Sequence, residues 1–353
     1  MNIILQILSF VILLGIIVLI HELGHFITAK RFGVYCGEFS IGMGPVLFKK
    51  QIGETQYSLR LLPIGGFVSM AGEEDDTKKD ENIPFERTIN GIKTYKKVIV
   101  MLAGIIMNII LAWVIFIGLS MASGERVLPA EAAVGDVVKD SIADEAGFQP
   151  GDKITKLTFE NGDSVSVDTF SDVVTQINYN PGETVFTIER DGKTLDLTAT
   201  PEYNKQSKTY LVGIYGPKSK VEKISIGESF VYGTEDMVSS STALFDSLGR
   251  IFQGKNLDQL SGPVGIFQVS AQAAESGLSV YLRLLAILSI NIGVMNALPL
   301  PILDGGRVLI TIIEKIRGRK LNEQLMNTLM WGGVLVLIAL MVYATFNDVL
   351  KLF

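Results

Sequence analysis

Four long apolar runs dominate the pattern of hydrophobic and polar positions along the chain. They cover residues 3–20, 98–122, roughly 279–300 and 329–346. Each run is long enough for a helix of about 20 residues, the length that crosses ~30 Å of hydrocarbon. The pattern therefore predicts a polytopic α-helical membrane protein with about four transmembrane helices. Composition agrees, because 48% of the 353 residues are hydrophobic and only 19% are charged.

The first apolar run could also be taken for a secretory signal peptide. It has no basic segment before it, and it continues into His21–His25 where a small-residue cleavage site would lie. We therefore expect a retained first helix.

Basic residues between the runs predict an orientation in the cell membrane. The loop between the first two runs and the loop between the last two are rich in Lys and Arg, so the positive-inside rule places both in the cytoplasm. The long segment 124–278 then lies outside, as do both termini. Lys93, Lys96 and Lys97 would also reach lipid headgroups. The net charge of -6 and the lack of a basic face exclude nucleic acid as a partner.

Composition divides the chain into four segments. Residues 1–123 hold the first two spans, 124–216 form an inserted extracytoplasmic domain, 217–278 form an amphipathic helix and connector, and 279–353 hold the last two spans. Within the first segment, residues 37–70 alternate Gly and Pro with strand-forming residues, which predicts a β-hairpin beside the membrane.

The inserted segment has the composition of a small soluble α+β domain. A hairpin is predicted around Asp191-Gly192, since these residues favour the turn that joins two strands. The single Cys36 excludes an internal disulfide, so this domain must be held by its own core. The expected elements are strands Val134–Val138, Lys153–Phe159, Thr184–Arg190 and Thr194–Thr200, a helix Thr169–Tyr179, an amphipathic surface helix Ile224–Phe252 and a tight connection at Ser261–Gly265.

The first run ends in the motif His-Glu-Leu-Gly-His. His21 and His25 are four residues apart, so on a helix they lie one turn apart on one face and can hold one metal ion. Glu22 is offset around the helix, where a carboxylate can take a proton from a metal-bound water. These are the only two histidines of the chain, and such a polar cluster at the end of an apolar span is costly unless it is paired or metal-bound. The alternative is a pair of hydrogen-bonded core histidines.

A third metal ligand must come from another span at matching depth, and Asp304 is the obvious candidate. It follows an apolar run that Pro299 and Pro301 interrupt, and the charge pattern places it at the cytoplasmic end, as it does His21 and His25. Asp304 could instead be the N-cap of a helix over Gly305–Ile316. Cys36 is a further possible ligand, although a lone thiol more often serves packing.

Together these motifs resemble the bacterial site-2 protease family, the zinc intramembrane proteases of the type that cleave anti-sigma factors. The resemblance rests on H-E-L-G-H, on N-x-L-P-x-P-x-L-D-G-G at Asn296–Gly306, and on a single PDZ-like insert that is most evident at Glu145–Ile154. It implies Zn²⁺ held by His21, His25 and Asp304.

The resemblance also implies roles for other residues. Glu22 would be the catalytic base, Asn296 would touch the backbone of the substrate, and residues 37–70 would form a membrane-re-entrant hairpin. The second span of the family usually reads A-G-P-x-x-N, whereas here Ile105 replaces the proline. Asn108 therefore stays a candidate for substrate contact, with the local helix geometry open.

The predicted function is hydrolysis of peptide bonds within or near the membrane segments of single-span proteins, such as anti-sigma factors and signal-peptide remnants. The resemblance implies that an upstream site-1-type protease first trims the same substrates. The PDZ-like insert would select trimmed substrates, or it would serve only as a scaffold. His₂Asp ligation also suits Fe or Mn. The alternatives are a membrane metal transporter and a non-catalytic membrane PDZ scaffold.

Overall fold

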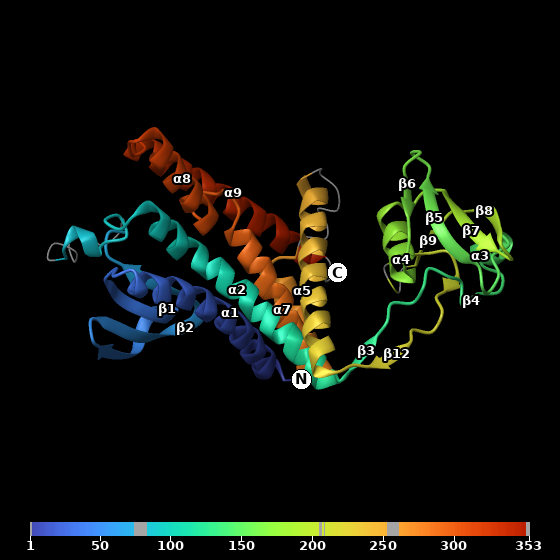
Figure 1. Cartoon of the computed structure of the whole chain (residues 1–353), viewed down its shortest axis with the longest axis horizontal. Coiled ribbons are helices and arrows are strands. Elements are labelled where there is room, and N and C mark those ends of the chain that lie inside the picture. The colour runs from blue at the N-terminus through green and yellow to red at the C-terminus, as the bar shows by residue number, and fades with distance from the viewer. Residues whose placement is uncertain (1, 74–82, 205–206, 208, 253–260, 351–353) are drawn as a thin grey trace. The chain divides into compact units, whose positions relative to one another are not determined.

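The computed structural model describes residues 2–73, 83–204, 207, 209–252 and 261–350 (Figure 1). The chain divides into two compact units. Met1–Ala122 and Ile226–Phe353 form the first, which we call the membrane unit, and Ser123–Ser225 form the second, the inserted unit.

Four helices of the membrane unit are long and apolar enough to cross a membrane, counting only the described residues. Three of them contain a whole apolar run and extend beyond it at one or both ends. The third helix in the chain ends at Asn296, about four residues before the end of its run, because the prolines follow there. The prediction of four apolar helices is confirmed. They are α1 (Ile3–Arg31), α2 (Thr94–Ser123), α7 (Leu278–Asn296) and α9 (Glu323–Leu350).

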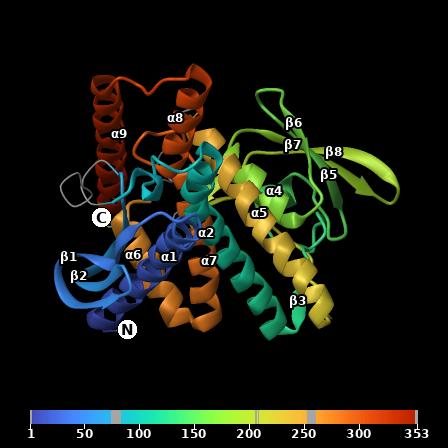
Figure 2. The same cartoon turned by 60° about the vertical axis from the view of Figure 1, so that its left-hand side comes forward.

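Helix α1 packs against both the β-hairpin and α7 within the membrane unit. Leu13 and Ile17 of α1 are fully buried against Leu285 of α7. Most other apolar side chains near the start of α1, such as Leu5 and Leu8, are exposed, as expected for a surface that faces lipid. Figure 2 shows the hairpin and α7 on either side of α1.

The segment predicted as a hairpin forms two long antiparallel strands, β1 (Cys36–Ile52) and β2 (Thr55–Met70). The hairpin curls, so that Phe39 of β1 pairs with both Tyr57 and Val68 of β2. The first part of β1 is therefore central, and residues 66–70 of β2 form an edge with which no other described strand pairs. We call residues 66–70 the edge segment.

Glu54, in the hairpin turn, ties the hairpin to its surroundings. Its carboxylate accepts hydrogen bonds from Lys30 Nζ at the end of α1, at 2.9 Å, and from Arg87 Nη2, at 2.7 Å. Arg87 belongs to the short 3₁₀ helix η1 (Phe85–Arg87). These two cations lower the pKa of the Glu54 carboxyl below its usual value.

Helix α5 (Ile226–Phe252) is amphipathic, as predicted. Its Met237, Leu244 and Leu248 pack against the cluster that contains Phe116 of α2 and Ile290 of α7. It is not among the helices apolar enough to span a membrane.

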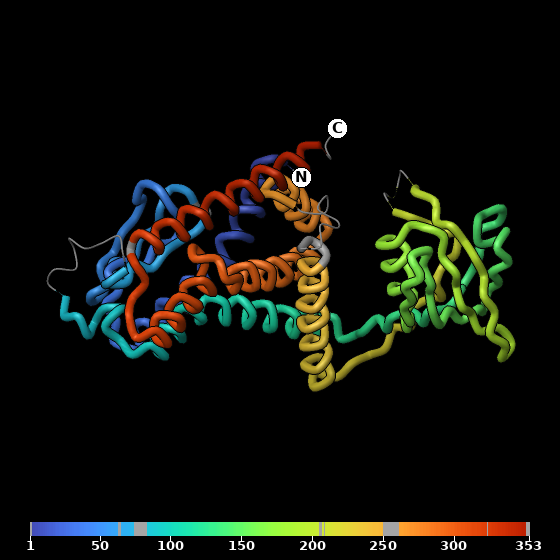
Figure 3. Tube along the Cα trace, turned by 90° about the horizontal axis from the view of Figure 1, so that it is seen from above, coloured from blue at the N-terminus to red at the C-terminus, as the bar shows by residue number. Residues whose placement is uncertain are grey.

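The expectation of a tight connection at Ser261–Gly265 is wrong, because helix α6 (Pro263–Ser276) begins there. Proline is favoured in the first turn of a helix, where its missing N–H is not needed. Asp348 Oδ2 of α9 accepts a hydrogen bond from Gly265 N at 2.7 Å and so caps α6 from another helix. Figure 3 shows α9 running across the membrane unit to end beside α6.

The inserted unit is built on a four-stranded antiparallel sheet in the order β6-β5-β7-β8. Residues Asp191 and Gly192 both adopt positive φ, 51° and 73°, and so form the predicted hairpin turn between β7 and β8. The elements are β3 (Glu125–Val127), β4 (Asp136–Val137), α3 (Ile142–Glu145), β5 (Lys153–Phe159), β6 (Ser164–Ser166), α4 (Phe170–Tyr179), β7 (Thr184–Arg190), β8 (Lys193–Ala199), β9 (Glu202–Asn204), β10 (Thr209–Leu211), β11 (Ile214–Tyr215) and β12 (Val221–Lys223).

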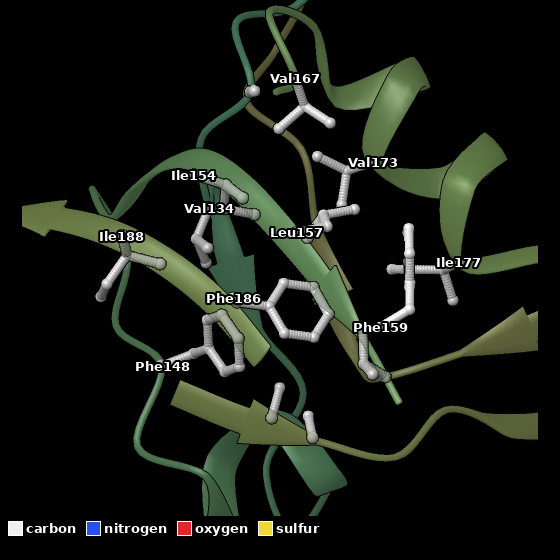
Figure 4. Close-up of a cluster of buried hydrophobic side chains, with 14 residues drawn as sticks. Val134, Phe148, Ile154, Leu157, Phe159, Val167, Val173, Ile177, Phe186 and Ile188 are labelled. Atoms are coloured by element: carbon white, nitrogen blue, oxygen red, sulfur yellow. The ribbon is translucent and has the colours of Figure 1, made fainter. Parts of the chain in front are cut away.

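The core of the inserted unit lies between this sheet and α4. The rings of Phe148 and Phe186 pack edge to face, with centroids 5.2 Å apart. Figure 4 shows them among Ile154, Leu157 and Val173. The strand predicted over Val134–Val138 is shorter than expected and pairs only at its centre, with β11. The first and last strands of the inserted unit, β3 and β12, pair with each other.

Candidate metal centre

The two histidines of α1 lie side by side on one buried face of the helix. His21 and His25 are 8% and 7% exposed, and their Nε2 atoms are 3.2 Å apart. The rings stand nearly perpendicular, at 79°, with centroids 4.8 Å apart. The four-residue spacing therefore brings one nitrogen of each ring to a common point.

Asp304 reaches the same point from another part of the chain. Its Oδ2 lies 3.1 Å from His21 Nε2 and 3.3 Å from His25 Nε2. Asp304 is the first residue of α8 (Asp304–Arg317), and the N-cap position is occupied by Leu303 with no side-chain hydrogen bond. The alternative role of Asp304 as a helix N-cap is therefore wrong.

The segment between α7 and α8 is folded tightly enough to bring Asp304 inward. Gly305 and Gly306 lie directly against the backbone of Ala297 and Leu300, where a β-carbon would collide with the carbonyl groups. Leu303 N donates to Leu300 O at 2.8 Å and closes a turn at the prolines. The double glycine after Asp304 is thus required by close packing of the backbone.

The three donor atoms fit a zinc ion. Zinc bonds of 2.0–2.1 Å in tetrahedral geometry place neighbouring ligand atoms about 3.3 Å apart, and the three separations here are 3.1, 3.2 and 3.3 Å. Asp304 Oδ2 is buried and has no hydrogen-bond partner among the described residues, so a bound cation would satisfy it. Two imidazoles and one carboxylate also leave a fourth position for water.

Helix α2 contacts both rings and fixes their orientation. His25 Nδ1 lies 2.8 Å from Val100 O, so it donates a hydrogen bond there and leaves the lone pair of Nε2 directed at the common point. Gly104 lies against both rings, since a β-carbon there would collide with His25 Nε2 and lie 2.7 Å from His21 Cε1. Sequence reasoning missed both contacts, which depend on how α2 is rotated toward α1.

Glu22 is half-buried and borders the edge segment of the hairpin. A β-carbon on Gly66 would lie 3.5 Å from Glu22 Cγ, so Gly66 permits the strand to run close beside this side chain. Next to it, a cavity of about 580 Å³ is lined by Phe67, Val68, Ser69 and Met70 of β2 together with Met101 of α2 and Arg307 of α8. The edge segment thus runs from beside Glu22 along one wall of a cavity.

The two candidate asparagines lie in different surroundings. Asn296 is the last residue of α7 and half-buried, and its side chain forms no hydrogen bond within the described residues. Asn108 is fully buried in α2, with its amide 3.3 Å from His21 Nδ1. Cys36 is buried in the hairpin, where burial raises the pKa of its thiol to about 12. It is not part of the group that gathers His21, His25 and Asp304.

Comparison with known proteins decides the family. The model of peptidase family M50 matches residues 9–340 of the chain. The chain belongs to peptidase family M50. This confirms the predicted site-2 protease family and the predicted class of metalloprotease. With its four apolar helices, this M50 chain is a multi-pass membrane protein.

Individual relatives of this M50 chain match along nearly their whole length. The regulator of sigma-W protease RasP of Bacillus subtilis is 31% identical, over 98% of this chain and 99% of the relative. The zinc metalloprotease RasP of Geobacillus kaustophilus is 33% identical, over 99% of this chain and 98% of the relative. A protein of Clostridium acetobutylicum is 37% identical, over 99% of this chain and 97% of the relative.

Proposed function

We propose that this chain is a zinc-dependent intramembrane endopeptidase, with His21, His25 and Asp304 as the zinc ligands. It hydrolyses peptide bonds within or near the membrane segments of single-span proteins. The observation that carries the proposal is the meeting of three donor atoms from α1 and α8 at separations of 3.1–3.3 Å. The name of the Geobacillus kaustophilus relative, zinc metalloprotease RasP, supports zinc as the metal.

The residues of the site divide the chemistry between them. Bound zinc would act as a Lewis acid toward the scissile carbonyl and would acidify a water molecule. Glu22 accepts the proton of the attacking water and then delivers it to the leaving amine. The Asn296 amide, free of other hydrogen bonds in the described chain, binds the backbone of the substrate.

The edge segment of the hairpin replaces the hydrogen bonds that a substrate helix must give up. A helix in lipid hides its backbone amides, and each one left bare costs several kcal/mol, so an unwound substrate needs new partners. Residues 66–70 form a strand edge beside Glu22 and along the cavity, and no other described strand pairs with this edge. Pairing with this edge holds the substrate in extended form with little demand on its sequence. The exposed apolar side chains of the hairpin, including Leu47, Phe48 and Leu61, suit contact with membrane lipid.

The basic loops favour an orientation with the metal centre toward the cytoplasm and with the inserted unit and both termini outside. The inserted unit is a PDZ-like domain that admits substrates after an upstream site-1-type protease has trimmed their outer domains. The sigma-W regulation in the name of the Bacillus subtilis relative points to anti-sigma factors as the substrate class.

Two substitutions test the proposal in purified protein with a single-span substrate in detergent. Glu22→Gln should keep one zinc per chain and reduce cleavage about 10²–10⁴-fold, because only proton transfer is removed. Asp304→Ala should lose both zinc and cleavage. A full rate in Glu22→Gln would exclude a protease that uses this base, and unchanged zinc content in Asp304→Ala would exclude Asp304 as a ligand. Metal flux that survives in Glu22→Gln would instead favour a transporter.

A further inference from the structure

Two buried side-chain atoms have no hydrogen-bond partner among the described residues, and both belong to the metal centre. They are Asp304 Oδ2 and Asn108 Oδ1. Buried polar atoms are nearly always paired, so each of these two needs an explanation. A cation between Asp304 and the histidines accounts for the first. The second lies on the far side of His21 and needs a different one.

Asn108 is held against the back of the His21 ring. It is fully buried in α2, and its Nδ2 lies 3.3 Å from His21 Nδ1. From α7, Ser289 Oγ donates to Asn108 O at 2.8 Å, and Gly293 allows close approach, since a β-carbon there would lie 3.3 Å from Asn108 Cβ. The amide therefore contacts a proposed zinc ligand at the ring nitrogen that faces away from the zinc.

The chemistry of imidazole determines what that nitrogen needs. A neutral histidine that binds metal through Nε2 carries its proton on Nδ1, and this N–H requires an acceptor. His25 has such an acceptor in Val100 O. Within the described residues, Nδ1 of His21 has only the amide of Asn108 at this distance, and a half-turn of that amide brings Oδ1 to face Nδ1–H. This rotation pairs Oδ1 with the Nδ1–H of His21 and takes Nδ2 away from that contact. The tautomer that metal binding requires of His21 therefore decides which way the amide faces.

We propose that Asn108 is a positioning residue for zinc, which accepts the Nδ1–H of His21 and so directs the Nε2 lone pair at the metal. This inference rests on the zinc site proposed above. It assigns Asn108 to the metal centre and not to substrate contact, in keeping with its complete burial.

The test measures zinc affinity of the purified full chain in detergent by competition with a chelator. Asn108→Leu keeps the size of the side chain and removes the acceptor, and it should weaken zinc binding about 10–100-fold. Asn108→Asp restores an acceptor oxygen and should bind zinc within about 3-fold of wild type or more tightly. Thr234→Val is the matched control, because it removes the 2.9 Å hydrogen bond from Trp113 of α2 to α5 without touching His21. It should leave zinc affinity unchanged.

Two results would overturn the inference while leaving the zinc site intact. One is wild-type affinity in Asn108→Leu, and the other is an equal loss in the Leu and Asp variants, which would indicate packing alone. Failure of the wild-type chain to bind zinc would instead refute the site itself, and the inference with it.

A spectroscopic measurement does not depend on folding of any variant. The chain has two histidines, so ¹⁵N-histidine labelling of the zinc-loaded protein reports on these two rings alone. Both should show protonated Nδ1 and metal-bound Nε2. Binding through Nδ1 of His21 would contradict the proposed role of Asn108.

Discussion

Gly104 sets the distance between α2 and the two histidines. Its missing side chain lets the backbone of α2 lie directly on the rings of His21 and His25, and Gly24 of α1 similarly meets the backbone of Ala103. The crossing of α1 and α2 is therefore made by small residues, as is common for helices in membranes. The geometry of the metal centre therefore depends on the lack of a side chain at Gly104 and Gly24 as well as on the three ligands.

Gly104→Ala should displace the imidazoles or push α2 away, because the new methyl group overlaps His25 Nε2. We expect loss of zinc affinity by at least about 10-fold, a size typical of disturbed ligand orientation. Gly118→Ala, on the same helix with no atom within 4 Å of the new methyl group, is the control. It should bind zinc like wild type and be slightly more stable. Equal zinc affinity in the two variants would contradict this account of the crossing.

The sequence was sufficient to nominate His21, Glu22, His25 and Asp304 as a group, and the structure brings the two rings and the Asp304 carboxylate together. Residue type and position at the ends of apolar runs carried that information. The contacts of Asn108 and Val100 with the rings could not be predicted, because both depend on the rotation of α2 about its own axis. An apolar helix in lipid shows little periodicity from which to predict that rotation.

At the scale of elements, the hairpin is the feature whose existence was predictable and whose path was not. Gly and Pro alternating with strand-forming residues such as Phe, Val, Ile, Tyr and Leu indicated short strands over residues 37–70. The double pairing of Phe39 with Tyr57 and Val68 depends on a series of register shifts, which follow from three-dimensional curvature and not from a local pattern. Helix α6 was missed for a related reason, since part of its capping comes from Asp348, more than 80 residues later.

The ion pairs of Glu54 with Lys30 and Arg87 should make the attachment of the hairpin depend on pH. Its pKa is lowered by Arg87 and Lys30, so the carboxylate contributes stability above the unfolded-state pKa of about 4.3, and the contribution is lost as pH falls through the lower folded-state value. Glu54→Gln should weaken protection of the hairpin against proteolysis at pH 7, by up to about 1 kcal/mol. It should also reduce the loss of protection as pH falls below 4.

Glu86→Gln is the control for this prediction, since Glu86 is exposed and forms no ion pair within the described chain. The same sensitivity to proteolysis in both variants would show that the Glu54 ion pairs do not hold the hairpin.

At the scale of the whole molecule, the chain is two units with separate cores. The inserted unit has its own part-buried ion pair, in which Arg190 Nε and Nη2 donate to the two carboxylate oxygens of Asp152, each at 2.6 Å. The Asp152 side chain is 1% exposed and also accepts a hydrogen bond from Gln149 N. The composition of the segment indicated such a separate domain, because strand-forming and polar residues there replace the apolar runs.

Arg190→Leu should destabilise the inserted unit by about 1–3 kcal/mol, because it removes two charge-assisted hydrogen bonds from a buried carboxylate. Zinc content should not change, because the ligands belong to the other unit. Hydrogen exchange of β5 and β7, measured together with zinc content, checks both statements. Lys193→Leu, an exposed change in the neighbouring strand, should alter neither. Loss of zinc from Arg190→Leu would show that the two units do not fold independently.

Removal of the inserted unit tests its role in substrate selection. Val127 of β3 pairs with Val221 of β12, so residues 128–220 can be replaced by an Asn-Gly turn that keeps this pairing. The shortened chain should cleave untrimmed and trimmed substrates at similar rates, whereas the full chain should prefer trimmed ones. Unchanged preference in the shortened chain would refute the proposed filter.

The contact of Gly104 with the imidazoles also limits how the enzyme can open. The backbones of α1 and α2 are in direct contact at Gly24 and Ala103. A peptide could therefore pass between these two helices only if that contact were broken. We therefore expect an unwound substrate to enter on the side where the edge segment lies beside Glu22 and shares a cavity with Arg307 of α8. Cross-links that lock α1 to α2 should leave turnover intact, whereas cross-links between α8 and β2 should stop it.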